Sequence, residues 1–238
     1  MIGSMTPAPP PGNPGTTYGL QDGTSANSWG LNNGGIPYYR EHLTRMVHMV
    51  HNAGKPAIVS VAGFTADQFS HLSVPAFTSG ADMVEYNFGC PNIWDKGEQK
   101  RIFSFQPEVV EYILSQAEAL YGNDRHAFAV KVSPFSDAVL LREVASVVAT
   151  HSQIVRAVTV CNTFPNGLMI DEHGKSVITY QRGLGGVGGK AMKHIALGQV
   201  EQWRHVLPSG IDVIGVGGVS TGRDVADLLH AGAKAVGM

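Results

Sequence analysis

The chain has 238 residues, a formal net charge of −2 and a hydrophobic fraction of 43%, values typical of a globular protein with one large core. Its basic residues form no cluster beyond KGEQKR at 96–101, and no apolar run reaches the ~18 residues of a membrane span, so neither nucleic acid nor a membrane is an expected partner. The two cysteines lie outside any Cys-x-x-Cys pattern and the ten histidines show no metal-binding spacing, which argues against a disulfide scaffold or a metal site and for a reducing, cytoplasmic location.

The N-terminal segment, residues 1–18, is rich in proline and glycine and is predicted to be flexible. It lacks the basic and apolar regions of a secretory signal. The first 56 residues contain no convincing strand, and the first regular element is a helix predicted over 39–52. Residues 19–238 are predicted to form one domain.

From residue 57 onward, short apolar runs alternate with amphipathic stretches. The runs predict strands at 57–63, 82–88, 127–133, 157–163, 212–218 and 234–238. The amphipathic stretches predict helices at 107–121, 138–150, 191–206 and 222–231. Strands that are apolar on both faces and separated by helices indicate a parallel sheet covered by those helices.

Polar residues and glycine at the strand ends favour a TIM-type (β/α)8 barrel over an open, doubly wound sheet. Asn87, Lys131, Asn162 and Gly217 each end or follow a predicted strand. Barrel enzymes place their chemistry at the carboxyl ends of many strands, whereas an open sheet concentrates it at one switch point. Only about six of the eight β/α units of such a barrel are found. The sequence therefore predicts an α/β fold with an incomplete barrel, as in a fragment or a truncated isoform.

The stretch YNFGCPN at 86–92 places a thiol, Cys90, between two amides, Asn87 and Asn92, at the end of a predicted strand. A thiol with an ordinary pKa of ~8.5 can act as a general base if its site deprotonates it. Asparagine side chains offer both a donor and an acceptor to a ring substrate. On its own, such a cysteine is equally well explained as a small buried hydrophobic residue.

This stretch resembles the active-site loop of the dihydroorotate dehydrogenases, specifically the soluble, fumarate-dependent class 1A, whose pattern is N-L-S-C-P-N. Five further stretches are similar to motifs of that family and follow in the same order around it: GTSANSWGLNNGG (23–35), AVKVSPFSD (129–137), CNTFPNGLMID (161–171), GLGGVGG (183–189) and GVGGVSTGRDV (215–225). Each is weak alone, but together and in order they are specific.

The resemblance implies an oxidoreductase, a flavoprotein that oxidises (S)-dihydroorotate to orotate through FMN in pyrimidine (UMP) biosynthesis, reduces fumarate to succinate, and forms a homodimer when complete. It implies that Cys90 is the catalytic base. The residues implied to bind the substrate are Asn27, Ser28, Trp29, Gly30, Leu31, Asn87, Asn92, Asn162 and Thr163. The residues implied to contact FMN are Asn87, Lys131, Cys161, Gly189, Gly217 and Gly218.

The sequence departs from the family pattern at several points. Gly89 stands where the soluble class has Ser, Trp29 where it has Met, and Asn32 where it has Pro. The family's Lys-Ser/Thr segment beside flavin and substrate, and its last Gly-Thr phosphate contact, have no match. We therefore expect residues 1–238 alone to bind FMN weakly and to be inactive. Two alternatives are a flavin barrel like that of dihydropyrimidine dehydrogenase, and a catalytically silent paralogue acting as a binding or dimerising subunit.

Overall fold

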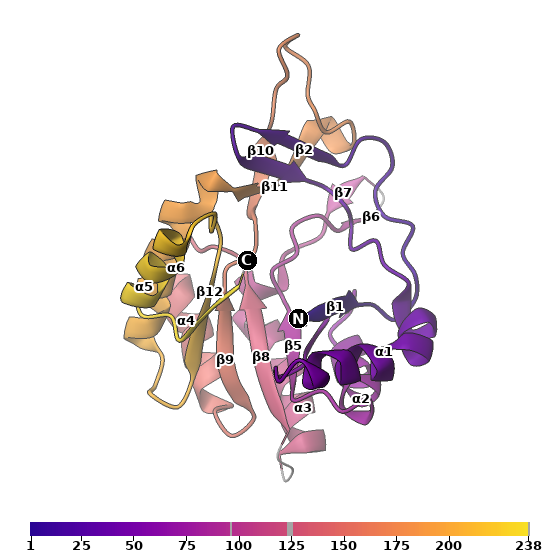
Figure 1. Ribbon diagram of the computed structural model, residues 1–238, viewed down its shortest axis with the longest axis vertical. Coiled ribbons are helices and arrows are strands. Elements are labelled where there is room, and N and C mark those ends of the chain that lie inside the picture. The colour runs from indigo at the N-terminus through magenta and orange to yellow at the C-terminus, as the bar shows by residue number, and fades with distance from the viewer. Residues whose placement is uncertain (96, 123–125, 238) are drawn as a thin grey trace.

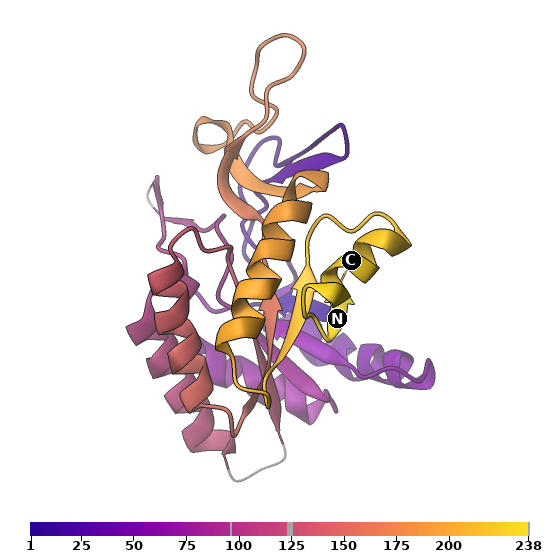
Figure 2. The ribbon, with the colours of Figure 1, turned by 90° about the vertical axis from the view of Figure 1, so that its left-hand side faces the viewer.

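The computed structural model describes residues 1–95, 97–122 and 126–237. Its main sheet has seven strands in the order β1-β4-β5-β8-β9-β12-β13, and every neighbouring pair is parallel. These strands are β1 (Ile2–Met5), β4 (Ile58–Val61), β5 (Met83–Asn87), β8 (Ala127–Val132), β9 (Val155–Val160), β12 (Asp212–Val216) and β13 (Ala235–Gly237). The sheet is a partial TIM-type barrel, and the two chain termini lie close together on its open side (Figures 1 and 2).

Six helices cover the outer face of this sheet. They are α1 (Gly35–Asn52), α2 (Gln68–Thr78), α3 (Pro107–Tyr121), α4 (Ala138–Thr150), α5 (Lys193–Val206) and α6 (Gly222–His230). Their apolar stripes and the strands form one core, in which Trp203, Tyr86 and Phe69 are among the largest fully buried side chains. In the described ranges, no helix combines the length and the hydropathy needed to cross a membrane.

A second, antiparallel sheet projects above the carboxyl edge of the main sheet (Figure 1). It consists of β2 (Tyr18–Gln21), β3 (Thr24–Asn27), β10 (Phe164–Leu168) and β11 (Leu184–Gly189), in the order β10-β11-β3-β2. The short strands β6 (Trp94–Asp95) and β7 (Glu98–Gln99) form a separate hairpin, and three 3-10 turns occur at η1 (Phe103–Phe105), η2 (Gln181–Gly183) and η3 (Lys190–Met192). The antiparallel sheet therefore forms a roof over the edge where the predicted site residues lie.

The predicted strands and helices after residue 57 are confirmed to within a few residues. The absence of strands from the first 56 residues is wrong, because that region forms β1, β2 and β3. β1 lies inside the Pro/Gly-rich segment 1–18, pairs with β4, and buries Met5 completely. Helix α2 was not predicted: Pro75 interrupts its pattern, and buried serines replace apolar residues on its inner face. One of these, Ser73, bonds the Tyr86 hydroxyl at 2.9 Å.

Candidate active site

Two adjoining cavities open along the carboxyl edge of the main sheet, beneath the antiparallel sheet. The larger has a volume of about 430 Å³ and the smaller about 290 Å³. Both are lined by Lys131, Asn162 and Thr163, so these three residues form the boundary between them. A barrel of this type carries its chemistry at this edge, which makes the pair of cavities the candidate active site.

The larger cavity has a wall of amides and hydroxyls with a single thiol. Its only charged lining residue in the described part of the chain is Lys131. The lining residues are Gly3, Ser4, Asn27, Trp29, Gly30, Leu31, Asn32, Asn33, Tyr39, Asn87, Cys90, Pro91, Asn92, Lys131, Asn162 and Thr163. Such a lining suits a polar, hydrogen-bonding ring rather than an apolar ligand.

Hydrogen bonds between asparagines fix the inner part of this wall. The Asn162 amide nitrogen donates to the Asn87 amide oxygen at 3.1 Å, and the Asn87 amide nitrogen donates to the Ser4 hydroxyl at 3.2 Å. The main-chain N–H of Thr163 donates to the Asn162 amide oxygen at 2.8 Å. The chain of bonds links β1, β5 and the end of β9, so these amides are oriented before any ligand binds.

A second chain of bonds joins the Cys90 loop to the roof. The Asn92 amide nitrogen donates to the Asn27 amide oxygen at 3.0 Å, and the Asn27 amide nitrogen donates to the Gly186 carbonyl at 3.2 Å. Asn13 also holds this loop, because its amide nitrogen donates to the Asn92 carbonyl at 3.2 Å. Asn27 therefore supports the loop as well as lining the cavity.

The Cys90 thiol is partly exposed at the cavity wall. Desolvation raises its pKa from 9.0 to about 11, while a hydrogen bond from the Asn92 main chain and the positive charge of Lys131 act in the opposite direction. At neutral pH the group is a thiol, and its thiolate is a strong base once formed.

The loop at residues 30–32 offers unpaired main-chain donors to the same cavity. The N–H groups of Gly30, Leu31 and Asn32 have no acceptor among the described residues. Leu31 has a φ of 61°, a conformation that non-glycine residues seldom adopt. Successive N–H groups in such a turn can form an anion-binding concavity. This loop is therefore the place in the larger cavity best suited to a carboxylate.

Lys131 is the free cation between the cavities. It lies near the end of β8 and, within the part of the chain that the structure describes, its ammonium makes no hydrogen bond or salt bridge. A lysine without a counter-ion at a shared wall can stabilise negative charge on a ligand in either cavity.

The smaller cavity is lined largely by glycine main chain. The lining residues are Ser25, Lys131, Cys161, Asn162, Thr163, Gly188, Gly189, Met192, Val216, Gly217, Gly218, Val219 and Gly237. The N–H groups of residues 217–219 have no acceptor among the described residues. The Cys161 thiol is buried, and desolvation raises its pKa to about 12. At neutral pH this side chain is therefore an uncharged part of the cavity wall.

The structure brings together all but one of the predicted site residues. Ser28 does not line either cavity: it is fully buried, and its hydroxyl accepts a hydrogen bond from Asn13 at 3.1 Å. Asn87, expected at both ligands, lines only the larger cavity. The other residues expected to bind substrate line the larger cavity, and the other residues expected to contact FMN line the smaller one.

Several lining residues were missed by sequence reasoning. Ser4 belongs to the unpredicted strand β1, and Gly3 beside it contributes no side chain to the wall. No counterpart of the Lys-Ser/Thr segment was found in the sequence; β1 brings a hydroxyl to the cavity but no cation. Tyr39 lies on the buried face of α1 and looks like an ordinary core residue in sequence. Asn32 and Asn33 directly follow the predicted loop and could have been included.

The glycine before Cys90 has a steric cause. A Cβ on Gly89 would lie 2.7 Å from the Ser133 main-chain nitrogen and 2.7 Å from the Val132 carbonyl carbon. The loop therefore packs directly against the end of β8, where a serine would not fit without movement. The neighbouring hydroxyl comes instead from Ser133, which is fully buried and donates to the Gly89 carbonyl at 3.4 Å.

These features define an α/β-barrel protein with a two-chambered polar site at the carboxyl edge of its sheet. Comparison with known proteins gives the family. The model of the family described as dihydroorotate dehydrogenase matches residues 1–238, and the chain belongs to that family.

Individual relatives agree with this assignment. A protein of Streptococcus equi subsp. equi is 33% identical over 233 residues, which is 97% of this chain and 71% of the relative. The dihydroorotate dehydrogenase (fumarate) of Trypanosoma cruzi is 31% identical over 237 residues, covering 98% of this chain and 72% of that enzyme. A crystal structure of the Eimeria tenella enzyme in complex with ferulenol superimposes with a TM-score of 0.80 at 19% identity, covering 100% of this chain and 68% of the other. That likeness supports the barrel fold.

The smaller cavity has features that fit FMN. A Cβ on Gly189 would lie 2.4 Å from the Gly23 carbonyl oxygen, and one on Gly218 would lie 2.5 Å from the Lys193 main-chain nitrogen. Side chains larger than glycine therefore have no room at these two positions. Free N–H groups at residues 217–219 suit a phosphate. Lys131 at the boundary suits negative charge on a flavin ring.

Proposed function

We propose that this protein oxidises (S)-dihydroorotate to orotate, with FMN in the smaller cavity and fumarate as the final electron acceptor. The observation that carries the proposal is the junction of the two cavities at Lys131, Asn162 and Thr163, with the Cys90 thiol on the wall of the larger one. Oxidation of a dihydropyrimidine needs a base for one proton and an acceptor for one hydride, in adjacent places.

The residues of the larger cavity suit each part of the substrate. The amides of Asn87, Asn92 and Asn162 can pair with the ring carbonyls and N–H groups. The main-chain donors of the 30–32 loop can hold the carboxylate. Cys90, as a thiolate, takes the proton from the carbon beside the ring carbonyl. FMN, when bound, accepts the hydride from the neighbouring carbon. Lys131 stabilises the negative charge that develops across the boundary.

The expectation that residues 1–238 alone are inactive rested on the unmatched Lys-Ser/Thr and Gly-Thr segments and on barrel strands that were not found. β1 supplies one of them and brings Ser4 to the larger cavity, where it orients Asn87. Because described residues line both cavities, we infer that this chain binds FMN and turns over. Its two unpaired cysteines suit the cytoplasm.

A homodimer is part of the same proposal. The roof exposes several large apolar side chains, Tyr18, Leu20, Leu168 and Ile170 among them. Exposed apolar patches of this kind mark contact surfaces. Light scattering of the purified chain tests it: the expected mass is twice 25.3 kDa, and a monomer at micromolar concentration contradicts it.

The function is tested by adding substrates to the FMN-loaded chain without oxygen. (S)-dihydroorotate should bleach the flavin absorption and yield orotate, and fumarate should restore the absorption. Dihydrouracil, which lacks the carboxylate, should bleach the flavin much more slowly. Faster bleaching by dihydrouracil would favour a dihydropyrimidine dehydrogenase-like enzyme, and a chain that binds FMN but is inert to both would favour a silent paralogue.

A further inference from the structure

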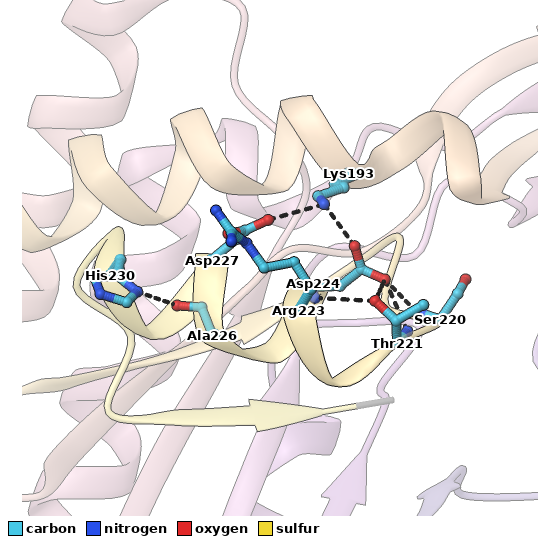
Figure 3. A network of polar contacts seen from close by, with 8 residues as sticks. All are labelled: Lys193, Ser220, Thr221, Arg223, Asp224, Ala226, Asp227 and His230. Atoms are coloured by element: carbon cyan, nitrogen blue, oxygen red, sulfur yellow. Dashed lines mark hydrogen bonds and ion pairs between the residues drawn. The ribbon is translucent and has the colours of Figure 1, made fainter.

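An ion-pair network joins the starts of α5 and α6, next to residues 217–219 of the smaller cavity's lining (Figure 3). Lys193, the first residue of α5, places its ammonium between two carboxylates of α6: 2.5 Å from an Asp224 oxygen and 2.9 Å from an Asp227 oxygen. Arg223 bonds the other oxygen of Asp227 at 2.8 Å. Lys193 thereby joins the starts of α5 and α6. The resemblance implied no site residue in either helix.

Asp224 also fixes the segment that follows the cavity wall. Its second oxygen accepts hydrogen bonds from the main-chain N–H groups of Ser220 and Thr221, at 3.0 and 2.8 Å, and from the Thr221 hydroxyl at 2.8 Å. The main-chain N–H of Asp224 donates in turn to the Thr221 hydroxyl oxygen, which completes a capping box at the start of α6. Asp224 therefore joins the first turn of α6 to the two residues that precede this helix.

Residues 217–219, which line the cavity, lie between these two attachments. On one side, Gly218 packs on the start of α5 so closely that a Cβ would lie 2.5 Å from the main-chain nitrogen of Lys193. On the other side, Ser220 is tied to Asp224. The Lys193–Asp224 pair closes the loop between the two sides.

The charges decide what Lys193 does. Two cations, Lys193 and Arg223, face two carboxylates, Asp224 and Asp227, so the network is neutral as a whole. The Lys193 ammonium is paired with both carboxylates (Figure 3), and Lys193 is not among the residues that line the smaller cavity. The free groups on the cavity side are the N–H donors of residues 217–219.

We propose that Lys193 and Asp224 are positioning residues that hold the 217–219 turn in the shape in which its main-chain N–H groups bind the phosphate of FMN. The inference rests on the proposed function, since it takes FMN as the ligand of the smaller cavity. Phosphate recognition by main-chain donors requires a fixed turn, because the ordering cost then falls on folding rather than on binding. The ion pair therefore contributes to affinity without touching the ligand.

The test compares FMN with riboflavin, which has the same ring but no phosphate. Dissociation constants are measured by flavin fluorescence for the wild-type chain, Asp224→Ala, Lys193→Gln and the control Arg223→Gln. Arg223 belongs to the same network, but its side chain is 83% exposed and, among the described residues, its ion-pair partner is Asp227 alone. We expect wild type to prefer FMN, and Asp224→Ala and Lys193→Gln to weaken FMN binding about tenfold, the loss of one charge-assisted bond. Riboflavin binding should stay unchanged in all variants, and Arg223→Gln should resemble wild type.

Each other outcome has a clear meaning. If Asp224→Ala and Lys193→Gln leave the ratio of FMN to riboflavin affinity unchanged, the network is merely structural and the inference is wrong, while the proposed function stands. If the wild-type chain binds neither flavin, the proposed function and the inference are both wrong. Should Asp224→Ala fail to fold, as judged by circular dichroism, Lys193→Gln decides alone, because it leaves the capping box in place.

Discussion

The rate at which Cys90 reacts with iodoacetamide should report the raised pKa of its thiol. Desolvation raises the pKa of this thiol from 9.0 to about 11. At neutral pH the thiolate fraction is then ~10⁻⁴, against ~10⁻² for a thiol with the ordinary value, because each pH unit of difference is a factor of ten. Only the thiolate attacks the reagent. Cys90 should therefore be alkylated roughly 100-fold more slowly than a free cysteine peptide at neutral pH.

The assay follows the labelling of Cys90 by mass spectrometry over a range of alkaline pH. The rate should rise about tenfold per pH unit and level off only near pH 11, the pKa of the group. Lys131→Gln should shift the midpoint upward, since the positive charge of Lys131 lowers this pKa. Lys55→Gln, a change at an exposed lysine, is the matched control and should leave the profile unaltered. A midpoint at or below the ordinary value of 9.0 would refute the assignment of a desolvated, protonated thiol.

Three further changes have defined outcomes. Gly89→Ser should lower the free energy of unfolding in chemical denaturation by roughly 1–3 kcal/mol, because the new Cβ meets the main chain of Ser133. The control Gly210→Ser should change it by less than ~0.5 kcal/mol, because a Cβ at Gly210 would have no atom within 4 Å. Asn27→Ala should cost about 1–3 kcal/mol in the same assay, since it leaves buried polar partners unpaired at both ends of its chain of bonds; no loss would mean that water replaces the amide. The folded pKa of Cys161 is raised to about 12, so the folded state keeps a proton that the unfolded state releases, and stability should fall with pH by up to ~1.4 kcal/mol per unit above the ordinary pKa of 9.0. That slope should be smaller in Cys161→Ala, and equal slopes would contradict the shift.

The sequence predicts β4, β5, β8, β9, β12 and β13 and the helices α3 to α6 well because the signals there are local and consistent. Pro107 begins α3 as its position suggests, and Thr221 with Asp224 caps α6. The main-sheet strands from β4 onward are short, largely apolar runs bounded by polar or glycine residues, as buried parallel strands are. These elements need no knowledge of tertiary contacts to be recognised.

The prediction fails where tertiary contacts override the local pattern. β1 has the sequence IGSM, with two small residues out of four, and it becomes a strand only because β4 offers it a parallel edge. The glycine-rich stretch LGGVGG, where no strand was predicted, forms β11, and its small side chains let it lie close to Thr163. A Cβ on Gly186 would come within 2.1 Å of the Thr163 hydroxyl oxygen. Such close packing has no signature in sequence periodicity.

Most residues predicted for the site line the two candidate cavities, and their roles stay predictions. Cys90 and its flanking asparagines stand out only through the family resemblance, because residue type and spacing alone fit a small buried cysteine equally well. The resemblance could not reveal that Ser28 is turned into the core, since a buried and an exposed serine look the same in a motif. Nor could it reveal Tyr39, whose place on the cavity wall depends on how α1 packs.

The reductive half-reaction of Cys90→Ala tests the central claim most directly. The chain is loaded with FMN, mixed with (S)-dihydroorotate without oxygen in a stopped-flow instrument, and followed by flavin absorption. Binding of FMN should be unchanged, because Cys90 lines the other cavity. Flavin reduction at neutral pH should be slower by roughly 10²-fold or more, the usual contribution of a positioned base, and Cys90→Ser should recover part of the rate only at high pH. Reduction of the flavin by Cys90→Ala at the wild-type rate would contradict the account.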